Sequence, residues 1–125
     1  MTQEIKYSFE DLDVWKKSID YACKVIELTN TINADRKHYR LIEQLEASAV
    51  SISSNIAEGK GRYSKKEFIQ YLYIARGSLF ESVTQLIIFH KNGWISDDSL
   101  LFVKQQGSEI GKMLSSLISS IRRTS

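Results

Sequence analysis

The chain contains no proline among its 125 residues, and apolar residues recur in four long stretches at alternating spacings of three and four. That spacing places side chains on one face of an α-helix, and without proline no helix interior is forced to break. The pattern predicts helices over about residues 10–30, 37–58, 64–92 and 97–123. Because short connections favour antiparallel neighbours, we expect one all-α domain over residues 1–125, an antiparallel up-down-up-down four-helix bundle.

Each predicted helix has one apolar stripe that is expected to face the core. In the first helix the stripe comprises Leu12, Trp15, Ile19, Ala22 and Ile26. In the second it comprises Leu41, Leu45, Ala49, Ile52 and Ile56. In the third it comprises Phe68, Leu72, Ala75, Leu79, Val83 and Leu86. In the fourth it comprises Leu100, Val103, Gly107, Ile110, Leu114, Leu117 and Ile121.

Residues near the predicted helix ends match known capping patterns. Ser8 with Asp11, and Ser64 with Glu67, have the spacing of a capping box at a helix N-terminus. Gly59 is well placed to adopt the left-handed conformation that ends many helices. We therefore expect the second helix to stop at this glycine.

The composition favours a soluble globular protein, with 42% hydrophobic and 26% charged residues. Cys23 is the single cysteine, so an internal disulfide is impossible and a reducing compartment is expected. No apolar run approaches the roughly 20 residues of a membrane span, and no secretory leader is recognisable. We expect a cytoplasmic protein without a membrane partner.

Patterns that support catalysis are missing from the sequence. A di-metal carboxylate bundle would need Glu-x-x-His motifs on two helices, and none occurs. A phosphate-binding P-loop and a Gly-x-Ser-x-Gly elbow are missing as well. Cys23 has no nearby histidine in the sequence, which favours an inert, half-buried thiol. We expect no catalytic residue, no metal site and no cofactor, and therefore no enzyme.

The third predicted helix is apolar around much of its circumference. Outside the inner stripe it also carries Ile69, Tyr71, Tyr73, Ile74, Phe80, Ile87, Ile88 and Phe89. One interpretation is a central, well-buried helix with some surface aromatics. The other is an interface between subunits, for which Tyr73 and Phe80 are candidates. Gly77 costs roughly 1 kcal/mol in a helix interior, which the close approach of another backbone would explain.

Positive charge is concentrated after the second helix. The net charge of the chain is only +2, but residues 60–93 hold six basic and two acidic groups. Most of the excess is Lys60, Arg62, Lys65 and Lys66, around an aromatic residue and next to a helix start. Such a cluster suits a phosphate backbone, and the alternative is an ordinary solvated turn.

Four segments of the chain form a recognisable series of motifs. They are FEDLDVWKK at 9–17, VSISSNIAEGKGR at 50–62, SKKEF at 64–68 and YIARGSL at 73–79. In this order they resemble the four-helix-bundle proteins named for the intervening sequences of bacterial 23S ribosomal RNA genes. The related accessory proteins of diversity-generating retroelements share the pattern.

The resemblance implies a four-helix bundle that assembles as a homopentamer. It also implies association with nucleic acid, since the retroelement relatives act with a reverse transcriptase and RNA. The chain departs from the family at two places. Glu46 and Ala47 stand where basic residues are usual, and Ser53 stands where proline is favoured.

Asn55, Glu58, Arg62 and Arg76 are the polar residues of these motifs with the clearest candidate roles. In a structural interpretation, Asn55 and Glu58 satisfy the end of the second helix, and Glu58 pairs with Arg62 or Arg76. In the alternative, Arg62 and Arg76 contact phosphate.

The sequence therefore predicts a non-enzymatic homo-oligomer that binds RNA, or an RNA-bound protein, through its basic loop and the following helix start. The alternative is an assembly module that engages only protein. The predicted nucleic-acid-binding residues are Lys60, Arg62, Lys65, Lys66 and Arg76. The predicted structural or interface residues are Asn55, Glu58, Gly59, Gly77, Tyr73 and Phe80.

Overall fold

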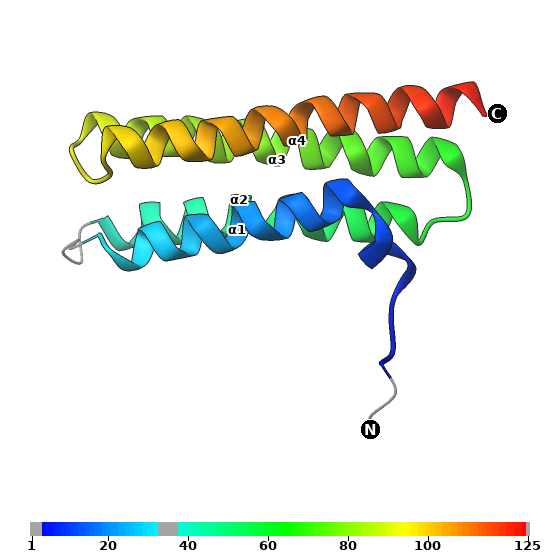
Figure 1. The fold of residues 1–125 in the computed structure, drawn as a ribbon, viewed down its shortest axis with the longest axis horizontal. Helices are drawn as coiled ribbons and strands as arrows, with labels where there is room; N and C mark the ends of the chain where they lie inside the picture. Colours follow the sequence, from blue (N-terminus) through cyan, green and yellow to red (C-terminus); the bar gives the residue numbers. More distant parts are fainter. Residues whose placement is uncertain (1–3, 33–37, 125) are drawn as a thin grey trace.

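The computed structural model describes residues 4–32 and 38–124. These residues form four α-helices, preceded by a short 3-10 helix (Figure 1). The elements are η1 (Ser8–Asp11), α1 (Asp13–Asn30), α2 (Tyr39–Lys60), α3 (Lys65–Lys91) and α4 (Asp97–Arg123). The predicted all-α bundle is confirmed. The expected start of the second helix at residue 37 lies outside the described residues.

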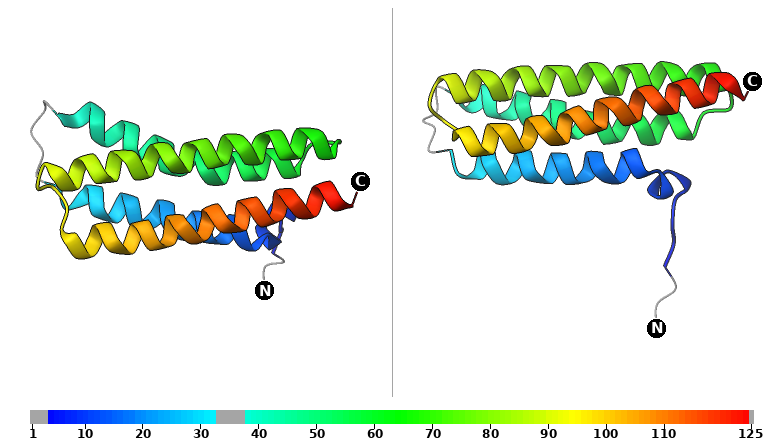
Figure 2. Two further views of the ribbon diagram at one scale, coloured as in Figure 1. Left: turned by 90° about the horizontal axis from the view of Figure 1, so that it is seen from above. Right: turned by 45° about the horizontal axis from the view of Figure 1, so that its top comes forward.

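The four helices stand at the corners of a bundle. Helix α1 packs against α2 and α4, and α3 packs against the same two helices. Successive helices run in opposite directions, as the colour gradient shows in Figures 1 and 2. The α2–α3 turn and the C-terminus therefore lie at the same end of the bundle. No helix among the described residues has the sustained hydropathy that crossing a membrane requires.

The core stripes of α2, α3 and α4 largely follow the predicted pattern. Two expectations were wrong, because Leu41 is exposed on α2 and Phe89 on α3 is buried. Ile118 is a further buried residue of α4 that the predicted stripe left out. The confirmed fully buried positions are Leu45, Ala49, Ile52, Ile56, Leu72, Ala75, Leu86, Val103 and Leu114.

The prediction for α1 chose a face of the helix that is rotated slightly from the face that is buried. Ile26 is exposed, and the buried face carries Val14, Ser18, Tyr21, Ala22, Val25, Leu28 and Thr29. Ser18, Tyr21 and Thr29 carry hydroxyl groups, so this face could not be recognised from the spacing of apolar residues. Ser18 donates its hydroxyl to the carbonyl oxygen of Trp15 at 2.6 Å, and Thr29 donates to the carboxylate of Glu46 on α2 at 2.5 Å. Burial of these polar groups is therefore tolerated.

Tyr21 carries its hydroxyl across the diagonal of the bundle from α1 to Ser82 on α3. The two oxygens are 2.8 Å apart, and both residues are fully buried. Ser82 donates its only hydroxyl proton to the carbonyl oxygen of Leu79 at 2.8 Å, so Tyr21 is the donor in the pair. Burial raises the pKa of Tyr21 to about 12, against a smaller opposing effect of the Ser82 hydrogen bond.

The helix ends confirm Ser64 as the cap of α3 and correct the prediction for Ser8. Ser64 accepts from the backbone N–H of Glu67 at 3.1 Å and donates to its carboxylate at 3.1 Å. Ser8 and Asp11 form no capping box, because they belong to η1. There the carboxylate of Glu10 accepts from the backbone N–H of Tyr7 at 2.8 Å.

Gly59 does not end α2, contrary to the prediction. The helix continues to Lys60, and among the described residues only Gly93 has a positive φ, of 79°. Gly59 is buried where α3 crosses closely. A Cβ atom at this position would lie 2.6 Å from the Cβ of Tyr71 and 3.0 Å from Cδ1 of Phe68. The glycine is needed for packing rather than for backbone conformation.

Gly59→Ala is expected to destabilise the fold by about 1–3 kcal/mol, the usual cost of overpacking a well-filled contact. Gly111→Ala on α4 is the matched control. Its Cβ would meet only Leu79 Cδ2 at 3.6 Å, so improved helix propensity is expected to stabilise by up to about 1 kcal/mol. Urea unfolding of both variants measures the difference. Equal effects at the two glycines would contradict the close α2–α3 contact.

The raised pKa of Tyr21 predicts a specific alkaline sensitivity. The tyrosine ionises near pH 10 in the unfolded chain and near 12 in the fold, so the unfolded state loses its proton first. Below pH 10 the contribution of Tyr21 to the free energy of unfolding does not change with pH. Between pH 10 and 12 the free energy of unfolding falls by about 1.4 kcal/mol per pH unit. Tyr21→Phe is expected to abolish this part of the slope.

Chemical unfolding between pH 9 and 12 provides the measurement. Tyr63→Phe, at a fully exposed position, controls for loss of a tyrosine. A slope in Tyr21→Phe equal to that of the unsubstituted protein would contradict the buried neutral hydroxyl.

Candidate nucleic-acid interface

The turn between α2 and α3 exposes the basic residues that the sequence analysis selected. Lys60 ends α2, Arg62 lies in the turn, and Lys65 and Lys66 begin α3. All four are exposed. The Ser64 cap fixes the helix start, so the positions of Lys65 and Lys66 are set by regular helix geometry.

Arg62 is held by the protein itself. Its guanidinium donates to Glu58 at 3.0 Å and to the hydroxyl of Tyr71 at 2.5 Å. The guanidinium carbon also lies 4.7 Å from the centre of the Tyr71 ring. The predicted pairing of Glu58 therefore occurs with Arg62. This arrangement links the end of α2 to α3 and uses one terminal nitrogen of the Arg62 guanidinium.

Asn55 does not satisfy the end of α2, contrary to the structural interpretation. Because α2 extends five residues further to Lys60, Asn55 lies inside the helix. Its amide donates one turn back to the carbonyl oxygen and the hydroxyl of Ser51, at 2.8 and 2.9 Å. The Ser51 hydroxyl is 2.9 Å from that of Ser78 on α3. Asn55 thus supports a polar contact between the two helices.

Lys65 and Lys66 meet the end of α4. A groove of about 440 Å³ lies between the two segments. Its lining residues are Lys65, Lys66, Ile69, Gln70, Tyr73, Ile121 and Arg122. Lys65 donates to the carbonyl oxygen of Thr124, and Arg122 donates to the hydroxyl of Tyr73 at 3.0 Å.

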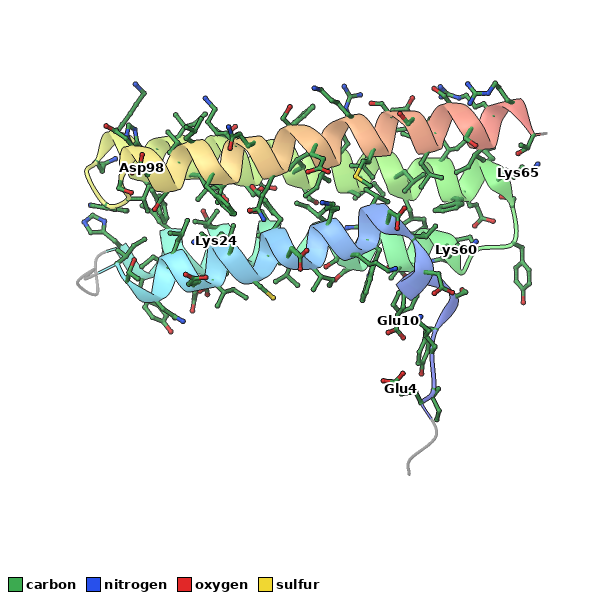
Figure 3. All side chains as sticks on the ribbon, viewed as in Figure 1. Glu4, Glu10, Lys24, Lys60, Lys65 and Asp98 are labelled. Atoms are coloured by element: carbon green, nitrogen blue, oxygen red, sulfur yellow. The ribbon has the colours of Figure 1, made fainter. Side chains whose placement is uncertain are left out.

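Arg122 and Arg123 were missed as site residues because the sequence suggested only that they suit the C-terminal end of a helix dipole. The predicted antiparallel order of the helices could have identified them, because it places the last turn of α4 beside the first turn of α3. Arg123 lines a neighbouring hollow of about 310 Å³ with Ser115, Ser116 and Ser119. Figure 3 shows Lys60 and Lys65 at this end of the bundle.

Of the five predicted basic residues, Lys65 and Lys66 line the groove beside the end of α4. Lys60 lies over the ring of Phe68, with its Nζ 6.0 Å from the ring centre. Arg76 is eleven residues, or about 16 Å, along α3 from Lys65. Its guanidinium carbon is 5.1 Å from the centre of the Phe80 ring, in a separate groove between α3 and α4.

The candidate interface residues of α3 are on the surface. Tyr73 and Phe80 are 43% and 54% exposed, and Ile74 and Ile88 are exposed nearby. Gly77 is exposed, and a Cβ atom there would meet no described atom within 4 Å. Packing within one chain therefore does not account for Gly77. If another backbone approaches Gly77, as the sequence predicts, that backbone belongs to a second molecule.

The described residues contain no cluster of three His, Cys, Asp or Glu side chains that could hold a metal. Cys23 is exposed rather than half-buried, which corrects the expectation from its position in α1. His90 lies 2.5 Å from the carboxylate of Asp97. The strongest feature for binding is the concentration of cations where α3 begins and α4 ends.

Comparison with known proteins agrees with the fold and motifs. A solved structure with 27% sequence identity and a TM-score of 0.78 covers 84% of this chain and 97% of its own. It is a protein of unknown function from the S23 ribosomal protein family of Bacteroides thetaiotaomicron VPI-5482. No curated protein matches the chain. The family model of the 23S rRNA-intervening sequence proteins matches residues 10–116. The chain therefore belongs to the 23S rRNA-intervening sequence protein family.

Proposed function

We propose that this chain is a non-enzymatic, homo-oligomeric RNA-binding protein of the cytoplasm. The binding surface is the basic end, which we define as Lys60, Lys65, Lys66, Arg122 and Arg123. Its ligand is the phosphate backbone of RNA, presented alone or by an RNA-bound protein. Arg62 contributes by fixing the turn, because its guanidinium is already held by Glu58 and Tyr71.

The convergence of Lys65, Lys66 and Arg122 on one groove carries this proposal. The residues that line the groove, all within the described part of the chain, include no aspartate or glutamate. The first turn of α3 adds the backbone N–H groups of Lys65 and Lys66 and the positive end of the helix dipole, while the N–H of Glu67 is bonded to Ser64. Cations near a helix N-terminus bind phosphate without reading bases, so recognition would depend on the shape and charge of the RNA.

Self-assembly through α3 is the second part of the proposal. Tyr73, Ile74, Phe80 and Ile88 expose a row of apolar surface along this helix. Gly77 lies among them with open space above it. A symmetric ring, for which the family resemblance favours five subunits, would bury this surface and repeat the basic end around its axis. The same apolar row favours the alternative of an assembly module without nucleic-acid binding.

Replacing Lys65, Lys66 and Arg122 together with glutamine is expected to weaken RNA binding. Three fewer phosphate contacts lower the slope of log affinity against log salt concentration by roughly two to three. Fluorescence anisotropy with a labelled structured RNA at several salt concentrations provides the measurement. The matched control replaces Lys16, Lys24 and Lys91, which removes the same charge elsewhere. Equal losses in both triple variants would contradict a site at the basic end.

Gly77→Leu is expected to reduce the oligomer to smaller species, because the added side chain would occupy the space left for another backbone. Light scattering coupled to gel filtration gives the mass in solution. Ser54→Leu, at an exposed position of α2, tests for a general effect of a surface leucine. If Gly77→Leu keeps the mass of the unsubstituted protein, the interface lies elsewhere.

A further inference from the structure

A second groove runs between the middle parts of α3 and α4 and has a volume of about 740 Å³. Val83 and Gly107 belong to its lining, together with the ring of Phe80. The cations Arg76, Lys104 and Lys112 line it as well, and no acidic residue does so among the described residues. The groove therefore combines an apolar surface with positive charge, which suits an acidic segment with apolar side chains.

The cations of this groove are available for a partner. Among the described residues, the ion pairs involve none of Arg76, Lys104 and Lys112. Glu109, an acidic residue of α4 close in sequence, instead pairs with Lys17 of α1 at 3.3 Å. An occupant with carboxylate groups would supply the missing counter-charges.

The chain itself contains a segment with these properties. We define the N-terminal arm as residues 4–11, which comprise an extended stretch and η1. Ile5 and Tyr7 are 87% and 63% exposed, unusually high for apolar residues of a folded segment. The arm carries Glu4, Glu10 and Asp11 against the single cation Lys6. Lys6 pairs with Asp11 at 3.0 Å, and Glu10 accepts from the backbone N–H of Tyr7 at 2.8 Å. Glu4 is therefore the carboxylate that the arm offers to a partner.

The arm points away from the groove of its own molecule. In Figure 1 it leaves the start of α1 on the side opposite α3 and α4, and Figure 3 shows Glu4 and Glu10 on that far side. The groove is lined along α4 from Lys104 to Ser116, a length of about 18 Å. Four extended residues, 4–7, span about 13 Å and fit within that length. A second copy can deliver such an arm without unfolding.

We propose that the N-terminal arm of one copy docks in the α3–α4 groove of a second copy. Ile5 and Tyr7 cover the apolar surface, and the carboxylate of Glu4 faces the cations Arg76, Lys104 and Lys112. Glu10 and Asp11 stay with η1 on their own bundle. The inference rests on the proposed self-assembly and specifies how neighbouring subunits are joined. Each subunit then gives one arm and receives another, so every interface in a ring of subunits is satisfied in the same way.

Site-directed crosslinking tests the exchange in the full-length protein. In a Cys23→Ser background, one population carries Ile5→Cys and a second, affinity-tagged population carries Thr84→Cys in the groove. After mixing, a short bismaleimide is expected to join tagged to untagged chains. A tagged Ser54→Cys population on exposed α2 is the matched control and is expected to give little product. Glu4→Lys is expected to lower the yield, and Lys104→Glu in the partner to restore it.

Light scattering on the same samples separates the possible failures. An oligomer that crosslinks no better at Thr84→Cys than at Ser54→Cys would overturn the arm exchange and leave self-assembly standing. A monomer at all concentrations would overturn both. The double variant Ile5→Ser, Tyr7→Ser, which removes the apolar side chains without adding charge, is expected to weaken self-association about tenfold or more. Unchanged association would also overturn the exchange.

Discussion

The hydrogen bond between Tyr21 and Ser82 fixes the arrangement of the bundle. It joins α1 to α3 across the core, where an unpaired hydroxyl would lose its hydration without compensation. The face of α1 that turns inward is therefore the one that contains Tyr21, with Ser18 and Thr29 beside it. Gly107 on α4 lies beside the same group and leaves room for its neighbours on α3, since a Cβ there would come within 3.3 Å of both Leu79 and Val83.

The contact between α2 and α3 sets the geometry of the turn that joins them. Gly59 allows Tyr71 and Phe68 to approach the backbone of α2. Hydroxyl contacts continue along the same pair, with Ser51 bonded to Ser78. Arg62 then closes the turn by reaching Glu58 and Tyr71. Small and hydroxyl-bearing residues thus position the start of α3, and with it Lys65 and Lys66.

The basic end depends on the alternation of helix direction. Lys65 and Arg122 are separated by 56 intervening residues, yet they line one groove because α4 returns along α3 to its first turn. The same pairing creates the middle groove with Arg76, Lys104 and Lys112. One pair of helices therefore offers two positively charged surfaces, and we assign RNA to the first and a neighbouring subunit to the second.

The sequence alone determined the four helices, the Ser64 cap and most core positions of α2 to α4, because local periodicity and capping act over a few residues. It also carried the motifs of the family. It did not determine the rotation of α1, since hydroxyl groups become suitable for a core only when a partner such as Ser82 stands opposite. Only the tertiary structure decided the packing role of Gly59, the hydrogen bonds from Asn55 to Ser51 and the place of Arg122 in the basic end. Each of these depends on which distant backbone or side chain comes within contact distance, and no local pattern encodes that.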